Sequence, residues 1–297
     1  MITAGFGTVN PRCEPGTLRG STKQAELARP RRRPIIGHVQ ASPRSASIIA
    51  PAYREAGNLE PLISRIAAAA RLSGWTVEIL IVDDDSQDGT EELIGRLGTS
   101  HPVRLIVRHE QRGLASAVLA GFREAKFDRF VVLDADLQHP PELIPDLLQR
   151  LDDPGCDFVL GTRYGHAGSI VASWPWKRRF ASRLATLSAR PLARVSDPMS
   201  GYFALPRSTW ERADRLDPVG YKIALELIVK GRCRQVAEIP IRFDVRSAGE
   251  SKFGIHQAIA YARHLGRLYR FRFPWLMPVV LVALAAFVLY AVFAVKR

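Results

Sequence analysis

Short apolar runs alternate along this chain with longer segments in which apolar residues recur every three or four positions. A short β-branched or aliphatic run predicts a buried strand, and the longer periodic segments predict amphipathic helices. We expect strands at 47–50, 76–82, 103–107 and 130–133, each followed by a helix, at 58–73, 89–97, 114–126 and 141–151. This alternation predicts the α/β class, with a mostly parallel sheet flanked by helices on both faces.

The segment before the first strand has no such rhythm. Residues 1–44 contain Pro, Gly, Ser and Arg without periodicity, including the run Arg29-Pro30-Arg31-Arg32-Arg33-Pro34. That composition predicts a disordered basic arm, and no hydrophobic stretch of a secretory signal interrupts it. We therefore expect the main domain to occupy residues 45–254.

Positive charge is concentrated at the two ends of the chain. The net charge is +13; residues 1–45 hold eight Lys or Arg and two acids, residues 242–297 hold nine and two, and residues 46–241 hold 25 of each. Nucleic-acid binding is not expected, because no aromatic-basic RNA motif or recognition helix accompanies the charge. An anionic membrane surface, which attracts each nearby cation by about 1 kcal/mol, explains basic ends more simply.

Two basic segments predict amphipathic helices at a membrane interface. Between Arg163 and Arg194 there are seven Lys or Arg and no acid, and Trp174-Pro175-Trp176 introduces a helix expected at about 175–192. A second helix is expected at 255–272, with apolar residues on one face and arginines elsewhere. Aromatic residues beside a basic amphipathic helix favour an interfacial position. A solvated basic helix on the domain surface is the alternative.

The last apolar stretch is long enough to cross a membrane. Residues 276–295 carry no charge, and about twenty apolar residues span a hydrocarbon core of roughly 30 Å. We expect a transmembrane helix at 275–295, and the alternative is a buried core helix. The positive-inside bias would place the main domain of this single-pass protein in the cytoplasm, since arginines precede the span at 263, 267, 270 and 272.

The fourth expected strand ends at a cluster of oxygen ligands. Asp134 and Asp136 follow the apolar run directly, and Gln138 comes two positions later. Ligands of open α/β sheets bind at the carboxyl ends of the strands. Three hard oxygen donors there suit Mg²⁺ or Mn²⁺, which also binds substrate phosphates. The simpler alternative is an acidic turn that caps the next helix.

Polar motifs also follow the first and second expected strands. The first strand leads into Pro51-Ala52-Tyr53-Arg54-Glu55, and the second leads into Val82-Asp83-Asp84-Asp85-Ser86-Gln87-Asp88-Gly89-Thr90. A carboxylate at this edge can accept hydrogen bonds from a nucleobase or a ribose. Asp84, Ser86 and Asp88 also match the start of an EF-hand loop, but its twelfth position is Gly95 where a Glu is required. An EF-hand is therefore excluded.

Three further polar segments lie beside apolar runs or in loops. A fifth strand at 158–160 is followed by Gly161-Thr162-Arg163-Tyr164, and a tight polar turn, Asp197-Pro198-Met199-Ser200-Gly201, precedes another apolar run. Arg246 and Lys252 lie six residues apart in a loop that contains glycine. Such cations can hold a lipid phosphate or a diphosphate, and the alternative is an ordinary charged loop.

Taken together, in this order and at this spacing, the motifs resemble those of the family 2 glycosyltransferases, and most closely those of the dolichol- or polyprenol-phosphate mannosyltransferases. The likeness covers residues 47–254. It implies a Rossmann-like GT-A fold and an inverting transfer of mannose from GDP-mannose to a polyprenyl phosphate, with Mg²⁺ or Mn²⁺ as the cofactor.

The resemblance also implies roles for individual residues. The nucleotide-sugar site would comprise Pro51, Tyr53, Glu55, Val82, Asp84, Asp134, Ala135 and Asp136. The metal would be held by Asp134, Asp136 and Gln138, and the donor and acceptor phosphates would be met by Arg163, Arg246 and Lys252. Asp134, Asp136 and Arg246 would be catalytic. Two residues depart from the family pattern, namely Arg54, where Asn is usual, and Asp85, where Gly is common.

Two other functions remain open from the sequence. The first is a polyprenyl-phosphate glucosyltransferase, or another sugar transferase, that uses a UDP-sugar. It stays open because the sequence does not identify the residues that would contact the sugar. The second is a membrane-tethered module that binds a nucleotide-sugar or Ca²⁺ without turnover. Transfer of labelled sugar to lipid separates all three.

Overall fold

The computed structural model describes residues 44–110, 112–164, 176–213, 216–217, 223–241 and 255–275. The expected basic arm, Arg246, Lys252 and the expected transmembrane segment at 275–295, from residue 276 onward, lie outside these ranges. The strands are β1 (Ser45–Ala52), β2 (Thr76–Asp83), β3 (Val103–Val107), β4 (Arg129–Val132), β5 (Phe158–Thr162), β6 (Phe203–Pro206) and β7 (Val236–Pro240). The helices are α1 (Ala56–Leu72), α2 (Thr90–Leu97), α3 (Leu114–Glu124), η1 (Pro141–Leu143), α4 (Ile144–Leu151), α5 (Trp176–Ala189), α6 (Arg207–Arg212), α7 (Ile223–Lys230) and α8 (Ile255–Arg272).

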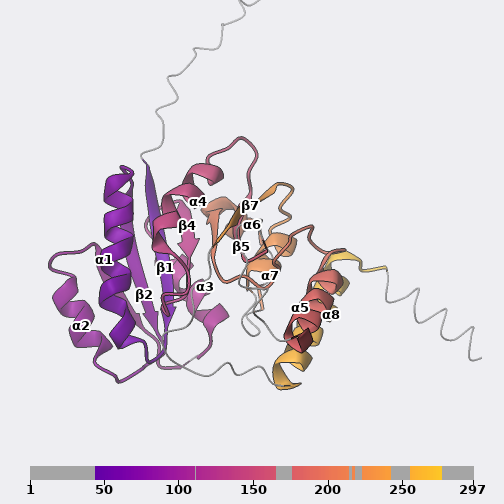
Figure 1. The fold of residues 1–297 in the computed structure, drawn as a ribbon, viewed down its shortest axis with the longest axis horizontal. Helices are drawn as coiled ribbons and strands as arrows, with labels where there is room; N and C mark the ends of the chain where they lie inside the picture. The colour runs from indigo at the N-terminus through magenta and orange to yellow at the C-terminus, as the bar shows by residue number, and fades with distance from the viewer. Residues whose placement is uncertain are drawn as a thin grey trace, which may run out of the picture. The chain divides into compact units, whose positions relative to one another are not determined.

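The described strands form a single sheet in the order β3-β2-β1-β4-β6-β5-β7 (Figure 1). β1 pairs in parallel with β2 and β4, β2 with β3, and β5 with β7, whereas β6 runs antiparallel between β4 and β5. The predicted mostly parallel sheet is therefore confirmed. The strand order reverses at β1, and a reversal of this kind opens a crevice at the carboxyl edge of the sheet.

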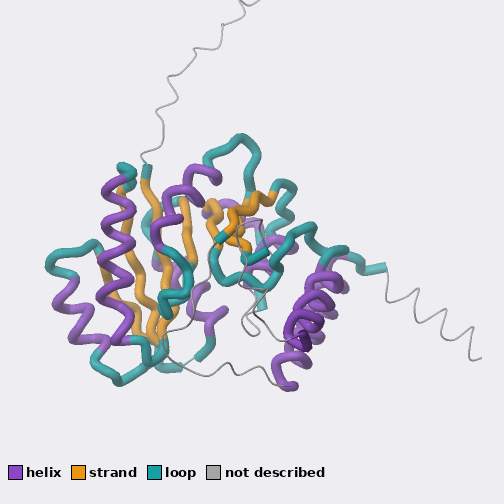
Figure 2. The backbone as a smooth tube through the Cα atoms, in the orientation of Figure 1, coloured by secondary structure: helices purple, strands orange, loops and turns teal. Residues whose placement is uncertain are grey.

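Helices cover both faces of the sheet, as the continuous apolar strands predict. One core cluster joins the sheet to α1, α2 and α4, and the other joins it to α3, α7 and α8 (Figure 2). Successive residues of a strand enter opposite clusters. Ile48 of β1 packs with α1, for example, while Ile49 packs with α3. Gly121 allows that second contact, because a Cβ at this position would lie 2.5 Å from Ile49 Cγ2.

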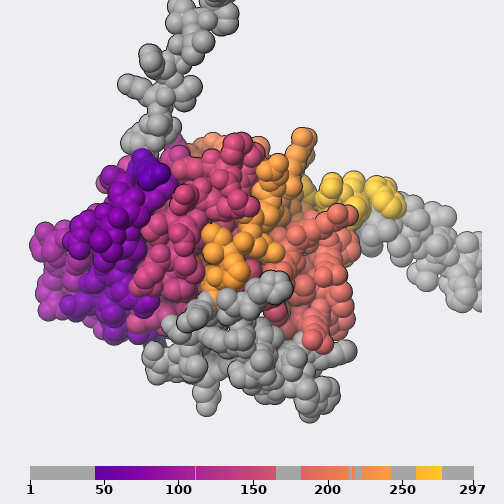
Figure 3. Space-filling model, turned by 45° about the horizontal axis from the view of Figure 1, so that its top comes forward, coloured from indigo at the N-terminus to yellow at the C-terminus, as the bar shows by residue number. Residues whose placement is uncertain are grey.

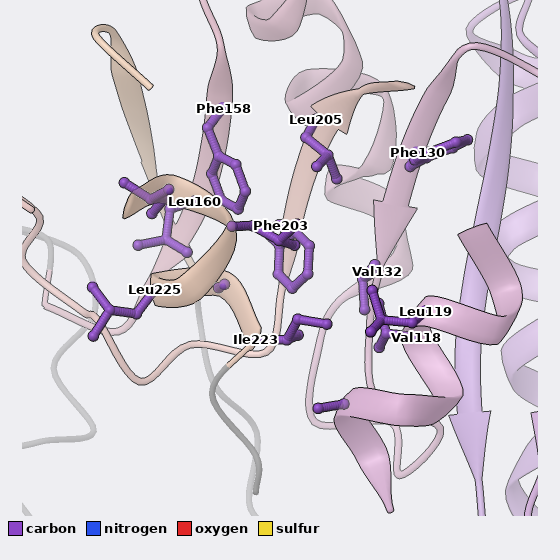
Figure 4. Close-up of a cluster of buried hydrophobic side chains, with 14 of the residues drawn as sticks. Val118, Leu119, Phe130, Val132, Phe158, Leu160, Phe203, Leu205, Ile223 and Leu225 are labelled. Atoms are coloured by element: carbon purple, nitrogen blue, oxygen red, sulfur yellow. The ribbon is translucent and has the colours of Figure 1, made fainter. Parts of the chain in front are cut away.

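The antiparallel strand is held in place by its own aromatic core (Figure 4). Phe203 of β6 stacks on Phe158 of β5, with ring centroids 5.2 Å apart. In the register of the sheet, Phe203 also pairs with Val132 of β4 and Leu160 of β5. Because β6 lies antiparallel to β4, the residues that precede it lie at the same edge as the residues that follow β4.

Several elements differ from the sequence prediction. The helix expected at 141–151 is divided into η1 and α4, with Pro141 and Pro145 near the starts of the two parts. Four elements have no counterpart in the prediction, because they come later in the chain than the strands and helices that were assigned from periodicity. They are β6, β7, α6 and α7. The basic segments form helices α5 and α8. Among the described residues, no helix has the length and apolar character that crossing a membrane requires.

Glu142 ties η1 to α1, and this contact makes stability depend weakly on pH. Arg65 donates two hydrogen bonds to its carboxylate, of 2.7 and 2.8 Å, and these lower the pKa of Glu142 from 4.5. Because the pKa of Glu142 is lower in the folded state than in the unfolded state, its ion pair stabilises the fold at pH values above the unfolded-state pKa. This contribution is lost as the pH falls through the folded-state pKa. Because the pair is exposed, we expect Glu142→Gln to lower the Tm by only about 1–2 °C at neutral pH.

The same substitution should lower the Tm less at an acidic pH than at neutral pH, because the contribution of the charged form is lost as the pH falls through the lowered pKa of Glu142. Thermal melts of both proteins at the two pH values test this. An equal loss of Tm at both pH values would mean that the side chain stabilises the fold by packing instead of by charge.

Candidate active site

The acidic residues after β4 lie in a tight turn at the carboxyl edge of the sheet. Leu137 adopts a left-handed backbone conformation, with φ of 62°, so the chain folds back after Asp136. The N–H of Gln138 then donates to Asp136 Oδ1 at 3.1 Å. A branched aliphatic residue rarely adopts this conformation, and strain of this kind concentrates at functional sites. The turn thus brings Asp136 and the backbone of Gln138 together.

Asp134 is fitted against a glycine and a histidine. A Cβ on Gly201 would lie 3.2 Å from both carboxylate oxygens of Asp134, so any side chain there would crowd the carboxylate. On the other side, the N–H of Asp134 donates to Nδ1 of His139 at 3.0 Å. The His139 ring stacks on Tyr202, and the Tyr202 hydroxyl donates to the carbonyl of Pro140 at 2.9 Å. These contacts fix the turn on β6.

His139 is neutral in this environment. Burial lowers its pKa to about 4; the charge of Arg163 lowers it further, and Asp136 and Asp197 act in the opposite direction. A neutral ring agrees with Nδ1 acting as an acceptor for the Asp134 N–H. Asp136, Arg163 and Asp197 therefore lie close to the His139 ring.

Arg163 lies at the end of β5 in a buried ion pair. Its Nε donates to Asp197 Oδ2 at 2.7 Å, and Nη2 donates to Asp197 Oδ1 at 2.8 Å. The carboxylate of Asp197 is fully buried, and 17% of the Arg163 side chain is exposed. Burial opposes the charge of Arg163, but the hydrogen bond to Asp197 and the charges of Asp197 and Asp134 outweigh it and raise the pKa of Arg163. A permanent cation is thus held beside the acidic turn.

The aspartates after β2 are used to shape their own loop. Asp83 accepts hydrogen bonds from the N–H and the hydroxyl of Ser86, and Asp88 accepts a hydrogen bond of 2.7 Å from the hydroxyl of Thr90. Asp84 accepts hydrogen bonds from Arg108 Nε at 2.8 Å and from the N–H of Gly113 at 2.7 Å. These hydrogen-bond donors therefore offset the electrostatic repulsion between the adjacent carboxylates. Asp84 also ties the segment after β3 to this edge.

Tyr53 presents an aromatic surface next to that loop. The side chain is exposed, and the guanidinium carbons of Arg54 and Arg112 lie 5.3 and 5.7 Å from its ring centroid. Asp85 Oδ2 lies 3.9 Å from Nη2 of Arg112. The two loops are joined because the N–H of Arg54 donates to the hydroxyl of Ser86 at 2.8 Å. Arg54 and Asp85 have φ of 60° and 57°, conformations that suit the Asn and Gly usual at these positions.

The structure brings most of the predicted residues to one edge of the sheet. Asp134, Ala135, Asp136, Gln138 and Arg163 lie at the ends of β4 and β5. Pro51 pairs with Val82 across β1 and β2, next to Tyr53, Glu55 and Asp84. Glu55 accepts a hydrogen bond of 2.5 Å from Asn58 Nδ2 and so lies at the start of α1. The other two predicted phosphate-binding residues, Arg246 and Lys252, lie outside the described residues.

Sequence reasoning gave no role to four residues of this edge, which are His139, Asp197, Gly201 and Arg108. His139 directly follows Gln138, and Arg108 directly follows β3, so their positions after strands were available signals. The roles of Asp197 and Gly201 were not readable, because they depend on the antiparallel direction of β6.

The acidic turn fits a divalent cation of the magnesium type. Two carboxylates and an amide are hard oxygen donors, and Asp134 retains 33% side-chain exposure. Among the described residues, no group of three His, Cys, Asp or Glu side chains is arranged as a complete metal site. A set of two carboxylates leaves coordination positions for substrate phosphates, as Mg²⁺ sites in nucleotide enzymes do.

A Rossmann-like sheet with an acidic turn and a fixed arginine at its carboxyl edge is typical of nucleotide-sugar transferases of the GT-A-like kind. Comparison with known proteins agrees: residues 47–208 match the model of the glycosyl transferase family 2. The chain belongs to this family and is a glycosyltransferase.

Two curated relatives are dolichol-phosphate mannosyltransferases. The chain is 44% identical to that of Mycosarcoma maydis over 261 residues, which cover 85% of this chain and 88% of the relative. It is also 44% identical to that of Pyrococcus furiosus over 228 residues, 75% of this chain and 63% of that longer relative.

The fold also resembles a solved structure, glucosyl-3-phosphoglycerate synthase from Mycobacterium tuberculosis in complex with Mn²⁺, UDP and glucosyl-3-phosphoglycerate. The TM-score is 0.56 at 20% identity, and the match covers 77% of this chain and 80% of that one. At this identity the likeness establishes the fold alone.

Proposed function

We propose that this glycosyltransferase transfers mannose, with inversion and in a metal-dependent reaction, from GDP-mannose to a polyprenyl phosphate of the dolichyl type at the cytoplasmic face of a membrane. The observation that carries the proposal is the acidic turn at Asp134–Gln138 with Arg163 fixed beside it. The reaction brings together two anions, the diphosphate of the donor and the phosphate of the acceptor. The acidic turn would bind the first through a metal ion, and Arg163 would offset the repulsion between the two. The names of the two relatives support the choice of sugar and acceptor.

The nucleotide-sugar would lie along the ends of β1, β2 and β4. Pro51, Tyr53, Glu55, Val82 and Asp84 would line the nucleotide, and Asp134, Ala135 and Asp136 would approach the diphosphate and sugar. Mg²⁺ or Mn²⁺, when bound, would neutralise charge on the departing diphosphate. Asp134, Asp136 and Gln138 would hold it.

The acceptor needs no general base from the protein. A phosphate monoester has a second pKa near 6, so it is largely dianionic at neutral pH. One of its oxygens attacks the anomeric carbon, and the bond from that carbon to the diphosphate oxygen breaks with its electrons going to GDP. Arg163, and by motif Arg246 and Lys252, would offset the repulsion between the two anions.

Helices α5 and α8 provide a surface suited to the membrane where the acceptor resides. They lie side by side: the hydroxyl of Tyr261 donates to the carbonyl of Ala185, and that of Tyr269 to the carbonyl of Ser188, both at 2.8 Å. Leu184 and Leu187 on α5 are 58% and 57% exposed, and α5 lies at the molecular surface (Figure 3). Exposed leucines on a basic helix are typical of interfacial helices.

A cationic cavity adjoins this surface. It has a volume of about 380 Å³, and the described residues that line it are Arg190, Arg194, Val195 and Ser196. The predicted span at 275–295 would follow α8 and anchor the chain. The arginines at 263, 267, 270 and 272 support a cytoplasmic position for the catalytic domain.

A UDP-sugar donor is the alternative. Arg54 and Asp85 both depart from the family pattern, and both lie in the loops that would hold the nucleobase. Glucose or another sugar on UDP would then replace mannose on GDP, with the same acceptor chemistry.

Transfer of radiolabel tests the proposal directly. Membranes containing the full chain are incubated with a polyprenyl phosphate and either GDP-[¹⁴C]mannose or UDP-[¹⁴C]glucose, with Mg²⁺ or Mn²⁺ present or removed by chelator. We expect lipid-soluble label with GDP-mannose and metal only. Label from UDP-glucose alone would establish the alternative, and nucleotide-sugar binding without transfer would contradict both.

A further inference from the structure

Asp197 is a buried carboxylate that the proposed chemistry does not use. The residue is 0% exposed and lies in the loop 196–201, which leads into β6. It accepts two side-chain hydrogen bonds from Arg163, at 2.7 and 2.8 Å, and a third from the Arg163 N–H at 3.3 Å. It also accepts one from the N–H of Met199 at 3.3 Å. A carboxylate with this many donors is fixed in place.

The loop around Asp197 is anchored on both sides of the sheet edge. The N–H and hydroxyl of Ser196 donate to Glu238 Oε1 of β7, at 2.7 and 2.9 Å. The same hydroxyl lies 2.6 Å from Thr162 Oγ1 of β5. At the other end of the loop, Gly201 lies against the carboxylate of Asp134. Loop 196–201 therefore joins β5 and β7 to the acidic turn after β4.

We propose that Asp197 is a positioning residue, which orients the guanidinium of Arg163 towards the acceptor phosphate. Through loop 196–201 it also fixes the position of that guanidinium relative to the carboxylate of Asp134. The inference rests on the proposed function, because it concerns the same site. The bidentate pair uses Nε and Nη2 of Arg163. A planar guanidinium gripped along one edge has a single orientation, so little entropy is lost when a phosphate binds.

A general-base role fits Asp197 less well. Both of its oxygens accept hydrogen bonds from Arg163, and the residue is fully buried. The dianionic acceptor carries no proton that must be removed at neutral pH. The arrangement therefore favours orientation over proton transfer.

The test is the kinetics of Asp197→Asn with polyprenyl phosphate as the varied substrate. The amide retains the volume but replaces one acceptor oxygen with a donor facing Arg163, so the guanidinium loses its fixed orientation. We expect kcat/KM for the lipid phosphate to fall about 100-fold, mainly through KM, because misplacing a group by an ångström has effects of that size. The affinity for GDP, measured by calorimetry, should be unchanged.

A matched control is Asp152→Asn. Asp152 also accepts a hydrogen bond from an arginine, Arg129 Nε at 2.8 Å, but Arg129 begins β4 and so lies at the opposite edge of the sheet. Its kinetics should equal those of the natural chain. Weakened GDP binding in Asp197→Asn, or acceptor kinetics within twofold of the control, would overturn the positioning role.

A second variant keeps the test valid if Asp197→Asn does not fold. Arg163→Lys retains the charge but cannot form the bidentate pair. It should show the same rise in the KM for lipid phosphate, and combining it with Asp197→Asn should add little. If Arg163→Lys transfers sugar with the same kinetics as the unsubstituted chain, the positioning role is refuted. If the unsubstituted chain transfers no sugar, the proposed function itself is refuted.

Discussion

Replacing Asp136 with asparagine is expected to reduce sugar transfer by about a thousandfold or more, because charge stabilisation of the leaving group is usually the largest catalytic contribution. The amide preserves the shape of the turn, including an oxygen that can accept the N–H of Gln138, now 3.1 Å from Oδ1. It removes the negative charge that would hold the cation against the diphosphate. The fold should therefore persist while the chemistry stops.

Two measurements accompany the transfer assay. Thermal melts should give a Tm close to that of the natural chain, and calorimetric titration with Mn²⁺ in the presence of GDP should show weakened binding. Asp128→Asn is the control, because that carboxylate pairs with Arg207 at 3.1 Å and is 86% exposed. Transfer within tenfold of the control would remove Asp136 from the metal site.

Replacing Arg163 with alanine is expected to lower the free energy of unfolding by about 3–5 kcal/mol, because it leaves a buried carboxylate without its partner. Asp197 has no side-chain exposure, so water cannot replace the two lost hydrogen bonds. Denaturant melts of the full chain measure the loss. Sugar transfer should fall as well, but stability is the decisive measurement.

A double variant and a surface pair complete this experiment. Arg163→Ala with Asp197→Ala removes both charges and should recover part of the lost stability. Arg212→Ala breaks an ion pair of 2.8 Å with Asp157 that is partly exposed, and it should cost no more than about 1 kcal/mol. If Arg163→Ala costs no more than Arg212→Ala, the buried pair does not stabilise the fold, and the rigid orientation inferred for Arg163 is wrong.

The first half of the fold was predictable because its strands are buried on both faces. A run such as 130–133 can be continuous and apolar only if each face meets a helix, and the helices between the runs have their own periodicity. The direction of β6 was not predictable. The run Tyr202–Leu205 is four residues long, and periodicity carries no information on whether a strand runs parallel or antiparallel.

The candidate site was predictable only where its residues directly follow strands. Asp134, Asp136 and Gln138 were found in this way. The carboxylates after the second strand were expected to face a nucleobase or a ribose, whereas the structure gives Asp83 and Asp88 hydrogen bonds within the loop. The base-binding role of Asp84 stays a prediction, as do the roles of the other site residues. The contact of Gly201 with Asp134 depends on three-dimensional packing alone.

The reversed strand β6 also divides the catalytic edge by chain order. Among the described residues, those before residue 140 that reach this edge follow β1 to β4 and would face the donor. Loop 196–201, α5 and α8 come later and would face the acceptor, and Arg163 would lie between the two substrates. Sequence changes after residue 140 could therefore alter which phosphorylated acceptor the enzyme uses, without changing the residues that would bind the nucleotide. Chimeras joined between β4 and α4 are a natural route to new lipid specificities.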